Sequence, residues 1–243
     1  RKIIDGYVLI GMHLSQFMYL DDAWIREQIV KVEHLEMDYW MAFMGGIGFG
    51  KPVSLDFYRL MYPSYERAVE TGKIDMHYHQ GILRHFLAFY FWDYEDVFEK
   101  TFLYRVLQTA DPKMIHELIS LLIQQKKAIL NEEEQNRNRL MRKIFEIWKT
   151  INVRISKLTE KEDLKLVSNI IYLTDFIDQL DEENTLLVDE NISMFNNDIS
   201  NIHLMKTILK WTKKSPAGFV ARLAVKFKTS YIYEKDPLLK LVE

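Results

Sequence analysis

The sequence predicts an all-α protein, and three observations along its 243 residues support that class. Apolar residues recur at steps of three and four, the period of a helix with one buried face. Polar capping residues and prolines stand where helices would begin. No segment shows sustained alternation of apolar and polar residues bounded by turn signals, as a half-buried strand would. We therefore expect stacked antiparallel helical hairpins, arranged as an α-solenoid-like unit or as two helical subdomains.

The stretch MAFMGGIGFGKPVS, residues 41–54, has the spacing of a phosphate-binding loop. Gly45, Gly50 and Lys51 match the pattern G-x-x-x-x-G-K. The residues before it favour an amphipathic helix rather than the buried strand that such a loop follows, and Pro52 stands where the loop needs Ser or Thr. We expect instead a helix that ends at Gly45 and the glycine after it, followed by a turn into the next helix.

Further helices are predicted from their capping residues. One helix is expected to start near Ser54 and to end at Gly72, with Pro63 breaking or kinking it. Three later starts pair a capping residue with a proline or glutamate at the appropriate distance, namely Asp111 with Pro112, Thr159 with Glu162, and Ser215 with Pro216.

The most regular helical pattern is a stripe of apolar residues in the second half of the chain. Asn131 is the expected cap of this helix, because three glutamates follow it where the helix dipole favours anions. The stripe consists of Leu140, Ile144, Ile147, Trp148, Ile151, Ile155 and Leu158.

The chain is expected to divide near its most polar stretch, residues 128–136. Residues 1–130 would form an aromatic-rich helical subdomain, in which Phe, Tyr and Trp at helical spacing fill the core. Residues 131–243, richer in Ile, Leu and Lys, would form a subdomain of helical hairpins. One continuous domain is the alternative.

Composition excludes several kinds of site. The chain has no cysteine, so disulfides, thiolate metal ligands and cysteine nucleophiles are absent. The formal net charge of −3 provides no global basic field for nucleic acid or anionic lipid. No apolar run approaches the length of a membrane-spanning helix, so we expect a cytoplasmic protein without a membrane partner. Because the chain begins with Arg1, we expect a piece of a longer protein.

One cluster of possible metal ligands is present. Asp75, His77 and His79 would share a face if their segment were extended, but His77 and His79 would point in different directions on a helix. His85 falls in an aromatic, helical run. A pair of histidines at a helix start, with one buried neighbour, is the favoured interpretation, and a metal-dependent enzyme is the alternative. No metal and no other cofactor is expected.

Charge is unevenly distributed in the last third of the chain. Residues 175–198 carry eight acidic residues and no basic one, whereas residues 202–233 carry seven basic residues and no acidic one. The basic residues expected to form a partner-binding face are Lys206, Lys210, Lys213, Lys214, Arg222 and Lys226. Interleaved aromatics, Trp211, Phe227, Tyr231 and Tyr233, would suit single-stranded nucleic acid. The favoured alternative is that neighbouring helices pair acidic and basic faces around buried aromatics.

Three stretches, LMRKIFEIWKTI, LTDFIDQLDEENTLLVDENISMF and LMKTILKWTKKSPAGFVARL, are similar in layout to a helical-repeat region of large bacterial antiphage defence proteins. The resemblance implies the C-terminal sensor arm of a chain with an N-terminal effector, such as a sirtuin-like NADase or a nuclease, often beside a STAND-type NTPase. It carries no active-site residues to this sequence. It implies recognition of a protein ligand or of other domains of the parent chain.

The expected function is therefore a non-catalytic helical sensor or scaffold module that binds a protein partner. Two alternatives remain open. One is a metal-dependent enzyme that uses Asp75, His77 and His79, and the other is nucleic-acid binding by the basic C-terminal third, which we consider the less favoured.

Overall fold

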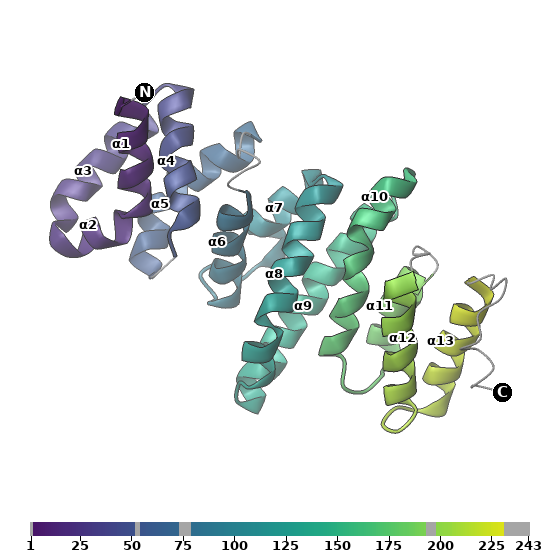
Figure 1. Cartoon of the computed structure of the whole chain (residues 1–243). Helices are drawn as coiled ribbons and strands as arrows, with labels where there is room; N and C mark the ends of the chain where they lie inside the picture. Colours follow the sequence, from purple (N-terminus) through teal and green to yellow (C-terminus); the bar gives the residue numbers. More distant parts are fainter. Residues whose placement is uncertain (1, 52–53, 73–78, 193–197, 231–243) are drawn as a thin grey trace. The chain divides into compact units, whose positions relative to one another are not determined.

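The computed structural model describes residues 2–51, 54–72, 79–192 and 198–230, and this part of the chain is helical throughout (Figure 1). It contains thirteen α-helices, two 3₁₀ helices and no strand. The predicted all-α class is therefore confirmed. None of the helices described has both the length and the apolar character that crossing a membrane requires.

The contacts between residues divide the chain into two compact units, 1–121 (unit 1) and 122–243 (unit 2). Unit 1 contains α1 (Lys2–Met12), α2 (Leu14–Leu20), α3 (Asp22–Glu33), α4 (Met37–Phe49), α5 (Leu55–Thr71), α6 (His79–Phe91), η1 (Phe98–Lys100) and α7 (Phe102–Thr109). Helix α8 (Pro112–Leu130) contributes to both units. Unit 2 continues with α9 (Glu134–Ile155), α10 (Lys161–Leu166), η2 (Val167–Phe176), α11 (Glu182–Ile192), α12 (Asp198–Trp211) and α13 (Ala217–Ser230).

Two of the predicted helix starts are confirmed by their hydrogen bonds. The Ser54 hydroxyl accepts a bond of 3.1 Å from a backbone N–H in the first turn of α5, and Asp111 accepts one of 2.7 Å in the first turn of α8. Helix α5 ends at Gly72, whose φ of 61° is the left-handed conformation that favours glycine. Pro63 does not break α5, because the helix continues through it.

Two other predicted caps are wrong. The backbone N–H of Asn131 bonds to the carbonyl of Ala128, so Asn131 closes the end of α8 and α9 begins three residues later. Helix α10 begins at Lys161, and the residue before it is Glu160 rather than Thr159. In both cases the helix begins later than the sequence pattern indicates, because its N-cap is Glu133 at α9 and Glu160 at α10.

The glycine-rich stretch lies inside a helix, which contradicts the prediction that α4 ends at Gly45 and Gly46. Helix α4 continues to Phe49 and ends at Gly50. The reason is its contact with α1, since a Cβ atom on Gly46 would overlap the carbonyl oxygen of Val8. Gly46 is a packing position that lets two helix backbones touch, and residues 45–49, where a phosphate-binding loop was considered, are helical.

Two further glycines show the same close approach of backbones. A Cβ atom on Gly11 of α1 would overlap the carbonyl oxygen of Phe43 in α4. A Cβ atom on Gly81 of α6 would overlap the backbone of Gly48, also in α4. Helix α4 is therefore held directly against α1 on one side and α6 on another.

The core of unit 1 is a cluster of aromatic side chains from α5, α6 and α7, as the aromatic spacing predicted. The ring centroid of Tyr65 lies 5.4 Å from those of Phe86 and Phe89. Phe86 in turn stacks on Phe102 at 5.2 Å. All four side chains are fully buried, and the edge-to-face and offset arrangements suit the charge distribution of aromatic rings.

The core of unit 2 confirms the apolar stripe of α9 and adds a segment that the sequence analysis missed. The stripe residues from Leu140 to Ile155 are buried, whereas the last predicted one, Leu158, lies beyond the end of α9 and is half-buried. Residues 167–176 form a ten-residue 3₁₀ helix, η2, where a continuous α-helix from Thr159 was expected. Its buried side chains recur at every third position, Val167, Ile170, Leu173 and Phe176, which matches the three residues per turn of a 3₁₀ helix.

We predict that Gly46→Ala lowers the free energy of unfolding of the chain by about 2 kcal/mol or more, because the added Cβ atom meets backbone that cannot move independently. Gly6→Ala in α1 is the matched control. No atom lies within 4 Å of its added Cβ atom, so the substitution should stabilise by about 0.5–1 kcal/mol. Urea unfolding of both variants measures the difference, and equal effects would contradict the packing role of Gly46.

Candidate protein-interaction surface

Two of the predicted basic residues at the end of α12 form ion pairs with one aspartate. Lys214 Nζ lies 2.6 Å from Asp178 Oδ1, and Lys210 Nζ lies 4.0 Å from the same atom. The hydrogen bond from Lys214 lowers the pKa of the Asp178 carboxyl group. These pairs join α12 to the segment that follows η2, and so part of the acidic run neutralises part of the basic run.

Two basic residues of α13 pair with Asp189 of α11. Arg222 Nη2 and Lys226 Nζ lie 3.1 and 3.0 Å from Asp189 Oδ2. This carboxylate is only 14% exposed, so the double pairing accounts for its burial. Of the six predicted residues, Lys206 and Lys213 alone have no carboxylate within 4 Å in the described part of unit 2, and both are exposed.

The aromatic residues between these basic residues lie in the core where they are described. Trp211 is completely buried, and its indole N–H donates a bond of 3.1 Å to the carbonyl of Ile177. Phe227 is also buried. Tyr231 and Tyr233 lie outside the described residues. Bases of a nucleic acid therefore cannot stack on Trp211 or Phe227 in this fold.

A groove between α9 and α11 in unit 2 has a shape that suits a partner. It encloses about 500 Å³, within the range of ligand-binding clefts. Its apolar lining comes from Val153 of α9 and from Leu186 and Leu187 of α11. Val153 is 57% exposed and Leu186 is 44% exposed, so two aliphatic side chains face solvent on either side of the groove. Burying them against a partner would be favourable.

The rim of the groove is predominantly acidic. Glu182, Glu183 and Glu190 line it, together with a single basic residue, Lys149. Lys149 forms an ion pair with Glu183, and Asn152 donates a bond of 2.8 Å to Glu190. The groove therefore carries an excess of negative charge over an apolar lining, which would attract a positively charged partner.

Beneath the groove, a buried chain of hydrogen bonds fixes α9 against α11. The indole N–H of Trp148 donates to Asn191 Oδ1 at 2.8 Å. Asn191 Nδ2 donates to Asn152 Oδ1, also at 2.8 Å, and Asn152 Nδ2 reaches the carbonyl of Leu187 at 3.3 Å. All three side chains are buried. Because each polar group has a partner, the network orients the two helices that form the groove.

Of the three predicted metal ligands, only His79 lies among the residues that the structure describes. Asp75 and His77 lie outside the described residues, and His79 is the first residue of α6. Among the described residues, no three histidine or acidic side chains are placed to hold a metal ion. The enzyme alternative based on these residues therefore stays a prediction.

His85 is a structural residue of the unit 1 core, in agreement with its place in an aromatic helix. It is fully buried, and burial lowers its pKa to about 4. Its Nε2 atom lies 3.1 Å from the Gly50 carbonyl oxygen, and its Nδ1 atom lies 2.6 Å from the Tyr65 hydroxyl. A carbonyl can only accept, so Nε2–H donates to Gly50 and Nδ1 accepts from Tyr65.

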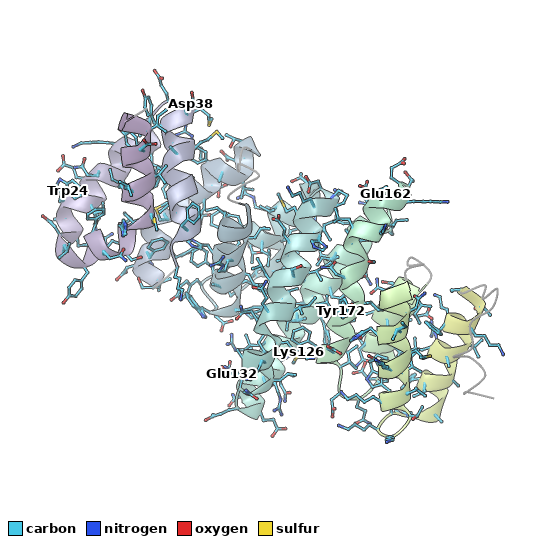
Figure 2. The ribbon with its side chains drawn as sticks, in the orientation of Figure 1. Trp24, Asp38, Lys126, Glu132, Glu162 and Tyr172 are labelled. Carbon is cyan, nitrogen blue, oxygen red and sulfur yellow. The ribbon has the colours of Figure 1, made fainter. Side chains whose placement is uncertain are left out.

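His203 of α12, in unit 2, belongs to a polar cluster that links α8, η2 and α12. His203 Nε2 and Lys126 Nζ lie 3.2 and 2.7 Å from the two oxygens of Asp175 (Lys126 is labelled in Figure 2). Burial raises the pKa of Asp175, but hydrogen bonds from His203 and Lys126 outweigh it and lower the pKa to about 2. Tyr172 packs on the His203 ring at 4.5 Å. The cluster joins three helices, α8, η2 and α12, and its role is structural.

In unit 1, the pKa of one carboxyl group, that of Glu95, is raised rather than lowered. Burial raises the pKa of Glu95 to about 7, and the nearby Glu66 adds to the rise. Glu95 accepts a bond of 3.1 Å from the backbone N–H of Phe102 and lies 3.4 Å from the Tyr58 hydroxyl. Arg105 pairs with Glu66 at 2.7 Å. Glu95 thus ties the start of α7 to α5, and its charge depends on pH near neutrality.

Comparisons with protein-family models, with curated protein sequences and with solved structures find no match for this chain. The resemblance to the sensor region of antiphage defence proteins therefore stays a prediction. The groove and the asparagine network were also missed by the sequence analysis. They join residues of α9 to residues of α11 that are distant along the chain, 43 positions for Trp148 and Asn191 and 39 for Asn152 and Asn191, so no local spacing connects them.

We predict that Asn191→Ala lowers the free energy of unfolding by about 2–3 kcal/mol, because it leaves the Trp148 N–H and the Asn152 carbonyl oxygen buried without their partner. Asn138→Ala on the exposed face of α9 is the control and should stay within about 0.5 kcal/mol of the wild type. Guanidinium unfolding distinguishes the two, and similar values would mean that the network contributes little.

Glu95 should make stability depend on pH. Between its ordinary pKa of 4.5 and about 7, the folded chain holds a proton at Glu95 that the unfolded chain has lost. The free energy of unfolding therefore falls as pH rises through this window. Glu95→Gln should remove that fall, so that its stability relative to the wild type rises by about 2 kcal/mol from pH 5 to pH 8, allowing for partial solvent screening.

Glu99→Gln, at an exposed position of η1, is the control for this experiment and should run parallel to the wild type. Urea unfolding at several pH values gives both curves. If Glu95→Gln also ran parallel to the wild type, the raised pKa of Glu95 would be contradicted.

Proposed function

We propose that this chain is a non-catalytic helical module that binds a protein partner, and that the groove between α9 and α11 receives a basic, amphipathic helix of that partner. The observation that carries the proposal is the combination of exposed aliphatic side chains with an acidic rim in one groove. Amphipathic helices bind such grooves through apolar anchors at one-turn spacing. Basic residues on the partner helix would flank those anchors.

The shape of the groove supports a protein ligand in two ways. Val153 and Leu186 present branched aliphatic groups to solvent, where an apolar side chain of the partner would cover both. The polar network beneath keeps α9 and α11 in place before the partner arrives, so little ordering would accompany binding.

The charge of the groove supports a basic partner. Three glutamates line it against a single lysine, Lys149, which pairs with Glu183. An exposed ion pair contributes little to stability, so a cation of the partner could replace Lys149 without large cost to the fold. Attraction between opposite charges would mainly increase the association rate and would weaken with salt.

The basic residues of α12 and α13 are the less supported surface. Four of the six predicted residues are already paired with Asp178 or Asp189. An acidic partner would have to compete with carboxylates of the same chain for these cations. Lys206 and Lys213 are exposed, but two lysines give a weaker electrostatic signal than the groove.

A synthetic amphipathic helix of leucine and lysine, about four helical turns long, tests the proposal. We expect the chain to bind it in fluorescence anisotropy, with an affinity that falls as salt increases. The double variant Glu182→Lys/Glu183→Lys should weaken binding at least about tenfold, because it reverses two of the three acidic rim residues.

The matched control is Glu160→Lys/Glu162→Lys, which reverses two exposed acids at the start of α10, outside the groove (Glu162 is labelled in Figure 2). It makes the same change in net charge and should retain binding within about twofold. Leu186→Asp should also weaken binding. Equal losses in the two double variants would show only a non-specific effect of charge and would overturn the proposed groove.

A further inference from the structure

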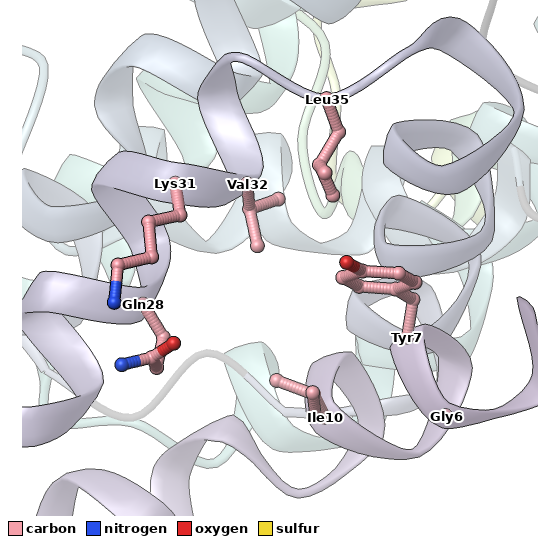
Figure 3. Close-up of a pocket in the computed structure, with 7 residues that line it drawn as sticks. All are labelled: Gly6, Tyr7, Ile10, Gln28, Lys31, Val32 and Leu35. Atoms are coloured by element: carbon pink, nitrogen blue, oxygen red, sulfur yellow. The ribbon is translucent and has the colours of Figure 1, made fainter. Parts of the chain in front are cut away.

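A second cavity lies in unit 1, away from the groove, between α1 and α3 (Figure 3). Both helices pack on α4, and α2 packs on α3 after connecting the two in sequence. The cavity encloses about 270 Å³, close to the lower end of the range for small-molecule sites, so it suits a small ligand.

The cavity has an apolar side formed by three aliphatic residues. Ile10 comes from α1, Val32 from α3 and Leu35 from the turn after α3, and Figure 3 shows all three side chains directed toward the same space. Gly6 completes the wall, and no atom lies within 4 Å of the position that its Cβ atom would occupy. The missing side chain therefore leaves part of the cavity open.

The polar groups of the cavity can all donate hydrogen bonds, and none of the described residues that line it is acidic. They are the Tyr7 hydroxyl, the Gln28 amide and the Lys31 ammonium group. In Figure 3 the ends of Gln28 and Lys31 lie together on one side, and the Tyr7 hydroxyl points into the cavity from the other. A cation with two neutral donors beside an apolar wall is complementary to a carboxylate that carries an apolar body.

The walls are held in place before any ligand binds. Arg67 donates to the backbone carbonyls of Glu33 and Leu35 at 2.8 and 3.2 Å, which fixes the turn after α3. The Tyr7 ring packs on Tyr39 of α4 at 5.6 Å. Little side-chain ordering would therefore accompany binding, which favours a small ligand with few contacts.

A ligand would compete with Glu27 for Lys31, because Lys31 Nζ lies 2.8 Å from Glu27 Oε1, one turn earlier in α3. Both side chains are more than half exposed, at 60% and 67%, so the pair is weak. A ligand carboxylate that also bonds to Gln28 would displace Glu27 from Lys31. The affinity of the cavity for an anion should therefore increase when Glu27 is neutralised.

From these contacts we infer that the cavity between α1 and α3 is a binding site for a small organic acid, whose carboxylate bonds to Lys31 and Gln28 and whose apolar body lies on Ile10, Val32 and Leu35. The site is independent of the proposed groove, since it lies in the other unit and takes a ligand of opposite charge. The two proposals can therefore fail separately.

The probe is 3-phenylpropionate, with the neutral 3-phenylpropanamide as its matched ligand, and binding to the full chain is measured by isothermal titration calorimetry. We expect the acid to bind and the amide to bind at least about tenfold more weakly, since it cannot form a charge-assisted bond with Lys31. Lys31→Met should weaken binding of the acid by about the same factor, whereas Glu27→Gln should tighten it about two- to fivefold.

Arg26→Met is the control, because Arg26 is the neighbouring cation of α3, pairs with Asp22 at 2.7 Å and does not line the cavity. It should bind the acid as the wild type does. Gly6→Leu, which extends a side chain into the cavity, should abolish binding while the helical circular dichroism stays unchanged. No binding by the wild type, equal losses in Arg26→Met and Lys31→Met, or equal affinity for acid and amide would each overturn the site.

Discussion

The close approach of helix backbones around α4 is the constraint on which unit 1 depends. Gly46 of α4 lies against α1, and Gly48 lies against Gly81 of α6, where any side chain at Gly46 or Gly81 would overlap backbone. Because α4 is fixed at two faces, its end at Gly50 is also fixed, and the Gly50 carbonyl can accept the hydrogen bond from buried His85. The same position of α4 supports α3, and with it the wall of the cavity.

Unit 2 is held together by polar side chains rather than by glycine contacts. Trp148, Asn191 and Asn152 form a buried chain of hydrogen bonds between α9 and α11. Around it, Asp189 pairs with Arg222 and Lys226 of α13, and Asp175 contacts Lys126 of α8 and His203 of α12. Such interactions depend on direction, so they fix the orientation of helices that apolar packing alone would leave less specific. The groove inherits its shape from that orientation.

Local features were predictable from the sequence because they depend on neighbouring residues. The all-α class, the caps Ser54 and Asp111 and the buried stripe of α9 are of this kind. The glycines of α4 were misinterpreted because glycine is a poor helix former, and only the contact with α1 explains its presence there. The repeat of three at residues 167–177 was available in the sequence but was taken for an ordinary helix. The groove depends on contacts distant in sequence, which no spacing reveals.

Helix α11 shows why a run of like charges does not by itself identify a binding surface. Asp189 faces α13 and is occupied by Arg222 and Lys226, so this charge supports the fold. Glu182 and Glu183 project on the side of α9, where Lys149 is the single cation in the groove. The acidic residues of one segment thus face two different surroundings, separated by the direction in which each residue leaves the helix. Pairing within the chain determines how much charge is left for a partner, and in the groove three glutamates stand against one lysine beside exposed aliphatic side chains.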